Sequence, residues 1–191
     1  PVMAKYGLPS IDLCIGPDGM AKTPKQKVDT AELLYETGKN YGLKIEQFIF
    51  DVLTFTLATG EDEFLDAGKN TLDGIRLVKE KFPNCFTTLG LSNISFGLMP
   101  YARKILNSIF LHHAVKVGLD SAIVNAKEII PYGEIDPKEK KLAEDLIFNV
   151  HPDALADLIS YFEKAGPQSN DKVKKVDVDP TWPPGKRANF R

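Results

Sequence analysis

The chain has 191 residues, of which 43% are hydrophobic and 26% are charged, and its formal net charge is −2. This composition is typical of a globular protein with one good core, and the near-neutral charge argues against nucleic acid or an anionic membrane surface as a partner. No stretch approaches the roughly 20 continuous apolar residues of a membrane helix, and no apolar signal-peptide segment opens the sequence, so we expect a cytoplasmic protein.

Four apolar runs, rich in β-branched and aromatic residues, predict strands. They occupy residues 11–16, 47–53, 86–92 and 121–126, and their starts lie 36, 39 and 35 residues apart. Near-continuous apolar runs of this length are typical of strands that are buried on both faces of a parallel sheet.

Amphipathic helices are predicted after each run, at residues 23–42, 68–82, 101–118 and 137–149. In the first of them Pro24 suits the opening helical turn. A strand followed by a helix, repeated four times at nearly constant spacing, indicates an α/β fold of parallel βα units.

Two architectures fit this repeat: an open doubly wound sheet and a (β/α)8 barrel. A complete barrel needs about 250 residues, so four units would make half of one. The regular spacing, together with the lack of a glycine-rich phosphate turn after any strand, favours the barrel.

The domain organisation follows from changes in this pattern. Residues 1–150 are interpreted as half of a barrel, residues 151–166 as a C-terminal helix, and residues 167–191 as a proline-rich linker or arm that leads toward another module. Because the first residue, Pro1, is not methionine, we expect the chain to be a piece of a longer protein.

The cysteines and histidines offer little chemistry. Cys14 and Cys85 are far apart in sequence, so we expect buried, reduced thiols rather than a disulfide framework or a zinc site. His112, His113 and His151 have no partner at metal-ligand spacing and are interpreted as core or solvated side chains.

Three of the predicted strands end in a polar residue set among apolar ones, namely Asp51, Asn93 and Asn125. In βα units the C-terminal ends of the strands carry the functional site. Any one of these residues alone would more simply cap a helix or close a turn, but three in corresponding positions favour a binding site. Asp51 is the strongest candidate, because an unpaired carboxylate among apolar neighbours is costly to bury and needs donors, which a ligand with paired N–H groups would supply.

Three stretches carry a resemblance to a known family: "FIFDVLTFTLATGEDE", "TLGLSNISFGL" and "FLHHAVKVGLDSAIVNA". Over about residues 5–162 the chain resembles the pterin-binding domain of cobalamin-dependent methionine synthase and its methyltetrahydrofolate methyltransferase relatives. The resemblance implies a (β/α)8 TIM barrel that holds folate at the C-terminal ends of its strands. This chain would form the C-terminal half, units five to eight, and would need the missing N-terminal half, from which the family takes further pterin contacts.

The resemblance also implies roles for the candidate residues. Asp51 and Asn93 would bind the pterin of tetrahydrofolate, with Asn93 as the catalytic residue near N5, and Asn125 would be a weaker substrate-binding candidate. The implied reaction is methyl transfer from 5-methyltetrahydrofolate to cob(I)alamin, so the chain would belong to a methyltransferase but would be incomplete alone. No D-x-H-x-x-G corrinoid motif occurs in the 191 residues, so the cobalamin is expected on a separate domain or protein.

Other functions are less consistent with the sequence. Dihydropteroate synthase, another pterin barrel, would have a basic residue in the third strand and an Arg-x-His in the last, and neither is present. A non-catalytic module that only docks a corrinoid protein stays open. An unrelated phosphate-binding barrel is disfavoured, because no glycine-rich loop follows the last two strands.

Overall fold

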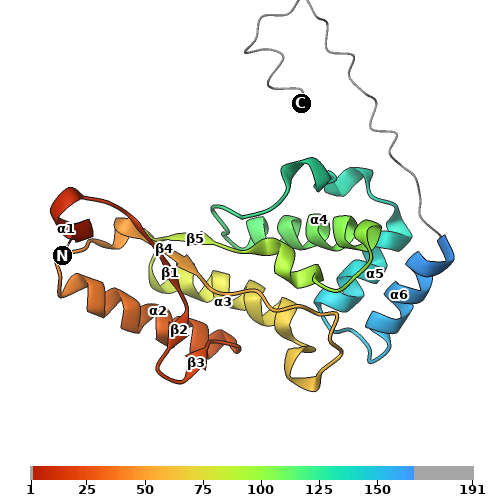
Figure 1. Cartoon of the computed structure of the whole chain (residues 1–191), viewed down its shortest axis with the longest axis horizontal. Helices are drawn as coiled ribbons and strands as arrows, with labels where there is room; N and C mark the ends of the chain where they lie inside the picture. Colours follow the sequence, from red (N-terminus) through yellow and green to blue (C-terminus); the bar gives the residue numbers. More distant parts are fainter. Residues whose placement is uncertain (1, 166–191) are drawn as a thin grey trace, which may run out of the picture.

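The computed structural model describes residues 2–165, which form a mixed α/β fold (Figure 1). A parallel sheet contains β1 (Ser10–Leu13), β4 (Phe48–Asp51) and β5 (Phe86–Thr88), in the order β1-β4-β5. A short antiparallel hairpin contains β2 (Ile15–Gly16) and β3 (Gly19–Met20). The α-helices are α1 (Val2–Tyr6), α2 (Pro24–Lys39), α3 (Ala67–Lys81), α4 (Pro100–Lys116), α5 (Pro137–Ile147) and α6 (Ala154–Ala165). Short 3-10 helices are η1 (Ile45–Gln47), η2 (Asp62–Phe64), η3 (Leu91–Ser95), η4 (Ala126–Glu128) and η5 (Tyr132–Glu134).

The predicted helices all form, and their local signals explain where they begin. The side-chain oxygen of Thr23 accepts a hydrogen bond from the backbone N–H of Gln26, and the side-chain oxygen of Gln26 accepts one from the backbone N–H of Thr23. Pro24 occupies the first turn of α2. Asp136 caps α5 in the same way, by accepting bonds from the backbone N–H groups of Lys138 and Glu139.

One face of the parallel sheet is packed against helices. Phe48 and Phe50 are fully buried and their rings stack at 5.5 Å, and Tyr35 of α2 and Phe82 after α3 complete an aromatic cluster. Figure 1 shows α2 and α3 below the strands. These aromatic contacts fix the two helices against that face.

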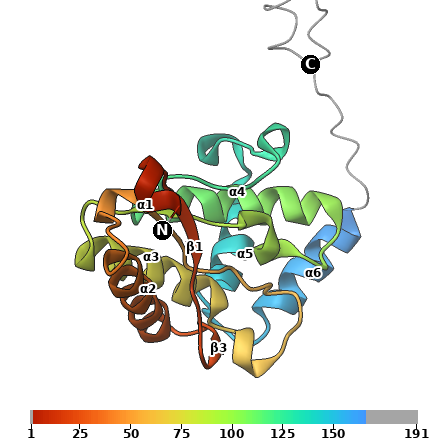
Figure 2. The same ribbon diagram turned by 60° about the vertical axis from the view of Figure 1, so that its left-hand side comes forward.

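The opposite face of the sheet is open in the described part of the chain. Ile11 and Leu13 of β1 are 58% and 49% exposed, and Phe86 of β5 is 47% exposed. Figure 2 shows β1 at the front of the molecule, with α2 to its left. Side chains alternate between the faces of a strand, so Asp51, which is paired with Leu13 and Thr88, belongs to this open face.

The fourth predicted strand, residues 121–126, does not form as a strand, and four complete βα units are not present in the described residues. The segment still runs beside β5, because Ser121 N donates to Thr87 O at 3.1 Å and Ile123 N donates to Leu89 O at 2.8 Å. The extended stretch ends at Asn125, which caps η4, so only these two backbone hydrogen bonds join it to β5 and the Thr87–Leu89 segment.

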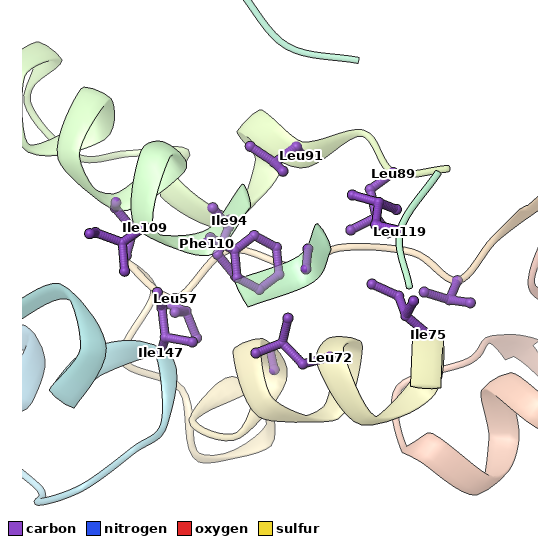
Figure 3. Packing of buried hydrophobic residues seen from close by; sticks show 14 of the residues in the cluster. Leu57, Leu72, Ile75, Leu89, Leu91, Ile94, Ile109, Phe110, Leu119 and Ile147 are labelled. Carbon is purple, nitrogen blue, oxygen red and sulfur yellow. The ribbon is translucent and has the colours of Figure 1, made fainter. Parts of the chain in front are cut away.

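The second part of the core is helical. Leu72 and Ile75 on one face of α3 point toward Phe110 and Leu119 (Figure 3). α4 packs against α3, α5 and α6, and α5 packs against α6. This helical layer supports the β5–η3 segment, where the apolar residues Leu89, Leu91 and Ile94 are fully buried.

The predicted C-terminal helix is present as α6, and Leu158 and Phe162 of its predicted apolar face are buried. The domain boundaries at residues 150 and 166 stay predictions, and the expected arm at residues 167–191 lies outside the described residues. Within residues 2–165, no helix combines the length and the apolar character that crossing a bilayer requires.

Candidate functional site

Asp51 is the last residue of β4 and is only 8% exposed. Its Oδ1 accepts a hydrogen bond from the backbone N–H of Leu53 at 2.9 Å, and the backbone N–H of Gly90 also donates to this carboxyl group. The carboxyl therefore lies between two loops, one after β4 and one after β5.

The electrostatics of Asp51 reflect two opposing effects. Burial raises the pKa of its carboxyl above the ordinary value, and this effect exceeds the lowering by the Leu53 and Gly90 amides and by the positive charge of Lys27. A further pair of donors would stabilise the ionised form and offset the cost of burial.

Asn93 lies in η3 and its side chain is exposed. Its backbone N–H donates to the carbonyl of Gly90 at 3.2 Å, and a Cβ atom placed on Gly90 would come within 3.1 Å of the Asn93 Nδ2. Gly90 therefore contacts both candidates: its N–H bonds to Asp51, and its Cα side lies against the Asn93 amide. The structure brings Asp51 and Asn93 to the same residue from neighbouring elements.

Asn125 has a different environment. Its Oδ1 accepts from the backbone N–H of Lys127 at 3.2 Å, its Nδ2 donates to Glu128 at 2.8 Å, and it caps η4. Both ends of the amide are thus used by its own turn, which is the ordinary role of an asparagine at such a position.

A residue that sequence reasoning missed is Lys27 of α2, whose side chain is fully buried. Its Nζ donates to the backbone carbonyls of Ala21 at 3.1 Å, Leu53 at 3.0 Å and Val52. The signal in the sequence was its spacing, because Lys27 lies four residues before Ala31 on the apolar face of the predicted helix.

The cysteines are both buried and free, as expected. Burial raises the pKa of Cys14 to about 12 and that of Cys85 to about 11, so neither thiol is a reactive nucleophile at neutral pH. His112 stacks on Tyr132 with ring centroids 3.9 Å apart, and His113 Nε2 lies 2.9 Å from Glu144 Oε1. Among residues 2–165, no group of three or more His, Cys, Asp or Glu side chains could hold a metal ion.

Comparison with protein families gives a match to the part of the chain that carries these residues. The family model described as "Pterin binding enzyme" matches residues 2–125, which include β1, β4, β5 and all three candidates. The chain belongs to the pterin binding enzyme family. The resemblance stated from the sequence is thereby confirmed at the level of the family.

Two relatives of this chain are named methionine synthase, the protein whose pterin-binding domain the sequence resembles. The methionine synthases of Mycobacterium tuberculosis (strain ATCC 25618 / H37Rv) and Mycobacterium leprae (strain TN) are 40% and 39% identical to this chain over 181 residues. Each alignment covers 93% of this chain but only 15% of the relative. The chain therefore spans a small part of the length of the curated relatives it matches.

Proposed function

We propose that the chain forms part of a binding site for 5-methyltetrahydrofolate, in which Asp51 and Asn93 bind the pterin. The observation that carries this proposal is the convergence of a buried carboxylate and an exposed amide on Gly90, at the C-terminal ends of β4 and β5. The family match and the methionine synthase relatives support a pterin as the ligand.

The chemistry of Asp51 suits the edge of a pterin ring. The ring presents a ring N–H and an exocyclic amine side by side, and an ionised carboxylate accepts such a donor pair with its two oxygens. Asp51 is held by two backbone amides and lies on the open face of the sheet, so its remaining acceptor capacity is available to a ligand on that face.

The chemistry of Asn93 suits the N5 region. Its side-chain amide has no hydrogen-bond partner among the described residues, and it offers both a donor and an acceptor. When the methyl group leaves N5, negative charge grows on that nitrogen and a proton must arrive. An oriented amide positions the ring and supports that protonation without being a strong acid.

The methyl acceptor in the proposed reaction is cob(I)alamin on another domain or protein, and its cobalt would supply the nucleophile. The part of this chain is to bind and orient the donor. The open sheet face supports a further partner, the N-terminal half of the barrel, which would cover Ile11, Leu13 and Phe86 and bring its own pterin contacts. Asn125, whose amide is bonded within its own turn, is proposed to shape the loop after residue 125 and to contact substrate only weakly.

The decisive experiment is Asp51→Asn in the full-length protein, with methyltetrahydrofolate affinity measured by calorimetry. We expect a loss of about 1.5–3 kcal/mol, roughly 10- to 150-fold, because a charge-assisted bidentate contact is removed while the shape is kept.

Asp12→Asn is the matched control for this substitution. Asp12 lies on the adjacent strand β1, but it pairs with Phe50 and thus belongs to the opposite, helix-covered face. Its substitution should leave the affinity unchanged. Unchanged affinity in both variants would favour the docking module, in which the barrel only receives a corrinoid protein.

A further inference from the structure

The loop that follows Asp51 contains a strained residue. Leu53 has φ of +65°, a left-handed conformation that costs a side chain with a Cβ on the order of 1 kcal/mol. Such a conformation persists only when surrounding contacts hold it. In this conformation the Leu53 N–H turns back to bond Asp51 Oδ1 at 2.9 Å.

The contacts that hold the loop come from two helices behind the sheet. Lys27 of α2 donates to the carbonyls of Val52 and Leu53, and Thr71 of α3 donates its Oγ1 proton to the same Leu53 carbonyl at 3.2 Å. One buried ammonium group, that of Lys27, thus bonds to the carbonyls of both residues that follow Asp51.

The fold makes room for this lysine. A Cβ atom on Gly74 of α3 would lie 2.5 Å from the Lys27 Cδ, so the close approach of α3 to α2 at this point depends on a glycine. Burial lowers the pKa of Lys27 to about 8, with the negative charge of Asp51 acting in the opposite direction, and the ammonium form therefore predominates at neutral pH.

We propose that Lys27 is a positioning residue for the pterin site: through the carbonyls of Val52 and Leu53 it holds Leu53 in the left-handed conformation that orients the Asp51 carboxylate toward the open face. The proposal rests on the proposed function of Asp51. Lys27 itself lies on the helix side of the sheet and touches no ligand.

The alternative is that Lys27 only contributes to stability, as any satisfied buried group does. The two roles differ in one respect. If Lys27 acts by holding Leu53, a residue that adopts positive φ without cost should make the lysine less necessary, and glycine is that residue. A purely structural lysine gains nothing from such a change.

The experiment is a double-mutant cycle in the full-length protein with Lys27→Met, Leu53→Gly and the two combined. Methionine keeps an unbranched side chain of similar length and removes the three hydrogen bonds. Two quantities are measured: the dissociation constant for methyltetrahydrofolate, and the amide hydrogen exchange of the peptide that contains residues 52–57. Leu158→Ala, in the core of α6 and remote in sequence from the loop, serves as a control for general loss of stability.

We expect Lys27→Met to weaken folate binding roughly tenfold and to speed exchange at Leu53, because a small misplacement of a binding group has a large effect on affinity. Leu53→Gly should restore most of that affinity in the Lys27→Met background. Leu158→Ala should lower the melting temperature and leave the affinity unchanged.

Three results would overturn the proposal: unchanged affinity in Lys27→Met while Asp51→Asn binds weakly, no recovery on adding Leu53→Gly, or a loss in Leu158→Ala as large as that in Lys27→Met. If the unsubstituted protein binds no methyltetrahydrofolate, the proposed function fails. The exchange of residues 52–57 still tests in that case whether Lys27 holds the loop.

Discussion

At the scale of single residues, Asp51 combines two requirements that normally conflict. It is buried enough for its pKa to rise, yet its donors leave acceptor capacity free for a ligand. A carboxylate in this state binds a donor pair more strongly than an exposed one, because less water has to be displaced from it when the ligand arrives.

The pH dependence of binding follows from this state. Ligand donors favour the ionised carboxylate, so binding lowers the pKa of Asp51, and affinity should be complete above the pKa of the free protein and fall as the pH drops through it. Because burial raises that pKa above 3.8, the fall should begin at a higher pH than for an ordinary aspartate. Dissociation constants measured from about pH 4 to 8 would check this. Titration of the ligand itself persists in Asp51→Asn, so identical curves for the two proteins would contradict the prediction.

Asn93 should affect the chemical step more than binding. Its amide is exposed and forms at most a neutral hydrogen bond to the ligand in the ground state. We expect Asn93→Ala to lower the rate of methyl transfer about 10- to 100-fold, with a smaller loss of affinity than in Asp51→Asn. Single-turnover kinetics would separate the two effects, with Ser92→Ala as the neighbouring control. A loss of affinity with an unchanged single-turnover rate at saturating ligand would assign Asn93 to binding alone.

How far the site could be predicted depends on how local its signals are. Asp51 stood out because a single carboxylate among apolar residues is costly wherever it is placed. Lys27 did not stand out, because its partners are the backbone carbonyls of Val52 and Leu53. The backbone conformation of these two residues cannot be predicted from amino-acid propensities. Asn125 has the same sequence signal as Asn93, and only the fold distinguishes the Asn125 amide, which is bonded within its own turn, from the Asn93 amide, which is exposed.

At the scale of elements, the segment after α4 shows how side chains replace a missing ladder. Asp120 Oδ2 accepts from the Thr87 N–H at 2.8 Å and from its Oγ1 at 3.1 Å, and it also pairs with Lys79 at 3.0 Å. Thr87 is fully buried, so these bonds satisfy polar groups that water cannot reach.

Removal of that carboxylate should destabilise the fold without harming the site. Asp120→Ala leaves the buried N–H of Thr87 without its acceptor, while the Thr87 hydroxyl still donates to the Gly118 carbonyl, and we expect a loss of about 1–3 kcal/mol in the free energy of unfolding. Denaturant unfolding would measure it. Ser121→Ala, an exposed neighbour, should change stability by less than about 0.5 kcal/mol. Equal stability of the two variants would show that the Asp120 bonds are replaced by water.

The helices were predictable and part of the sheet was not, for a physical reason. Caps and a 3.6-residue repeat lie within the helix itself, as Thr23 and Pro24 show for α2. A strand, by contrast, depends on backbone hydrogen bonds from neighbouring segments. The apolar run at residues 121–126 predicts a strand, but the segment forms only two such bonds beside β5 and no regular strand. The β2–β3 hairpin has a local signal, the Pro17–Asp18–Gly19 turn, which directly follows the strand predicted at residues 11–16.

At the scale of the whole molecule, the open sheet face is the dominant surface feature. The β1 strand is a sheet edge and carries the exposed side chains of Ile11 and Leu13, and Phe86 lies on the same face. Apolar faces of this kind are covered in complete folds or lead to association. The face should therefore behave differently in this chain alone and in the full-length protein.

Leu13→Lys tests this difference. In residues 1–191 alone the added charge should reduce self-association and the binding of a hydrophobic dye, because Leu13 is 49% exposed there. In the full-length protein the same lysine would be enclosed, and the melting temperature should fall. Light scattering and thermal unfolding of both proteins would check the reversal. An improvement in both proteins would mean that this face stays in contact with solvent in the full-length protein as well.

The groups that orient Asp51 all come from one short part of the chain. These groups are Lys27, Leu53, Thr71 and Gly90, which occur within residues 27–90. Among the described residues, no part of the chain beyond Asn93 forms a hydrogen bond to them. During synthesis the ribosome therefore makes every donor and acceptor of this arrangement before it makes α4. A nascent chain can therefore already orient the Asp51 carboxylate, because the residues that bond to it and to its loop have been made. The later helices pack against this arrangement and make it more rigid.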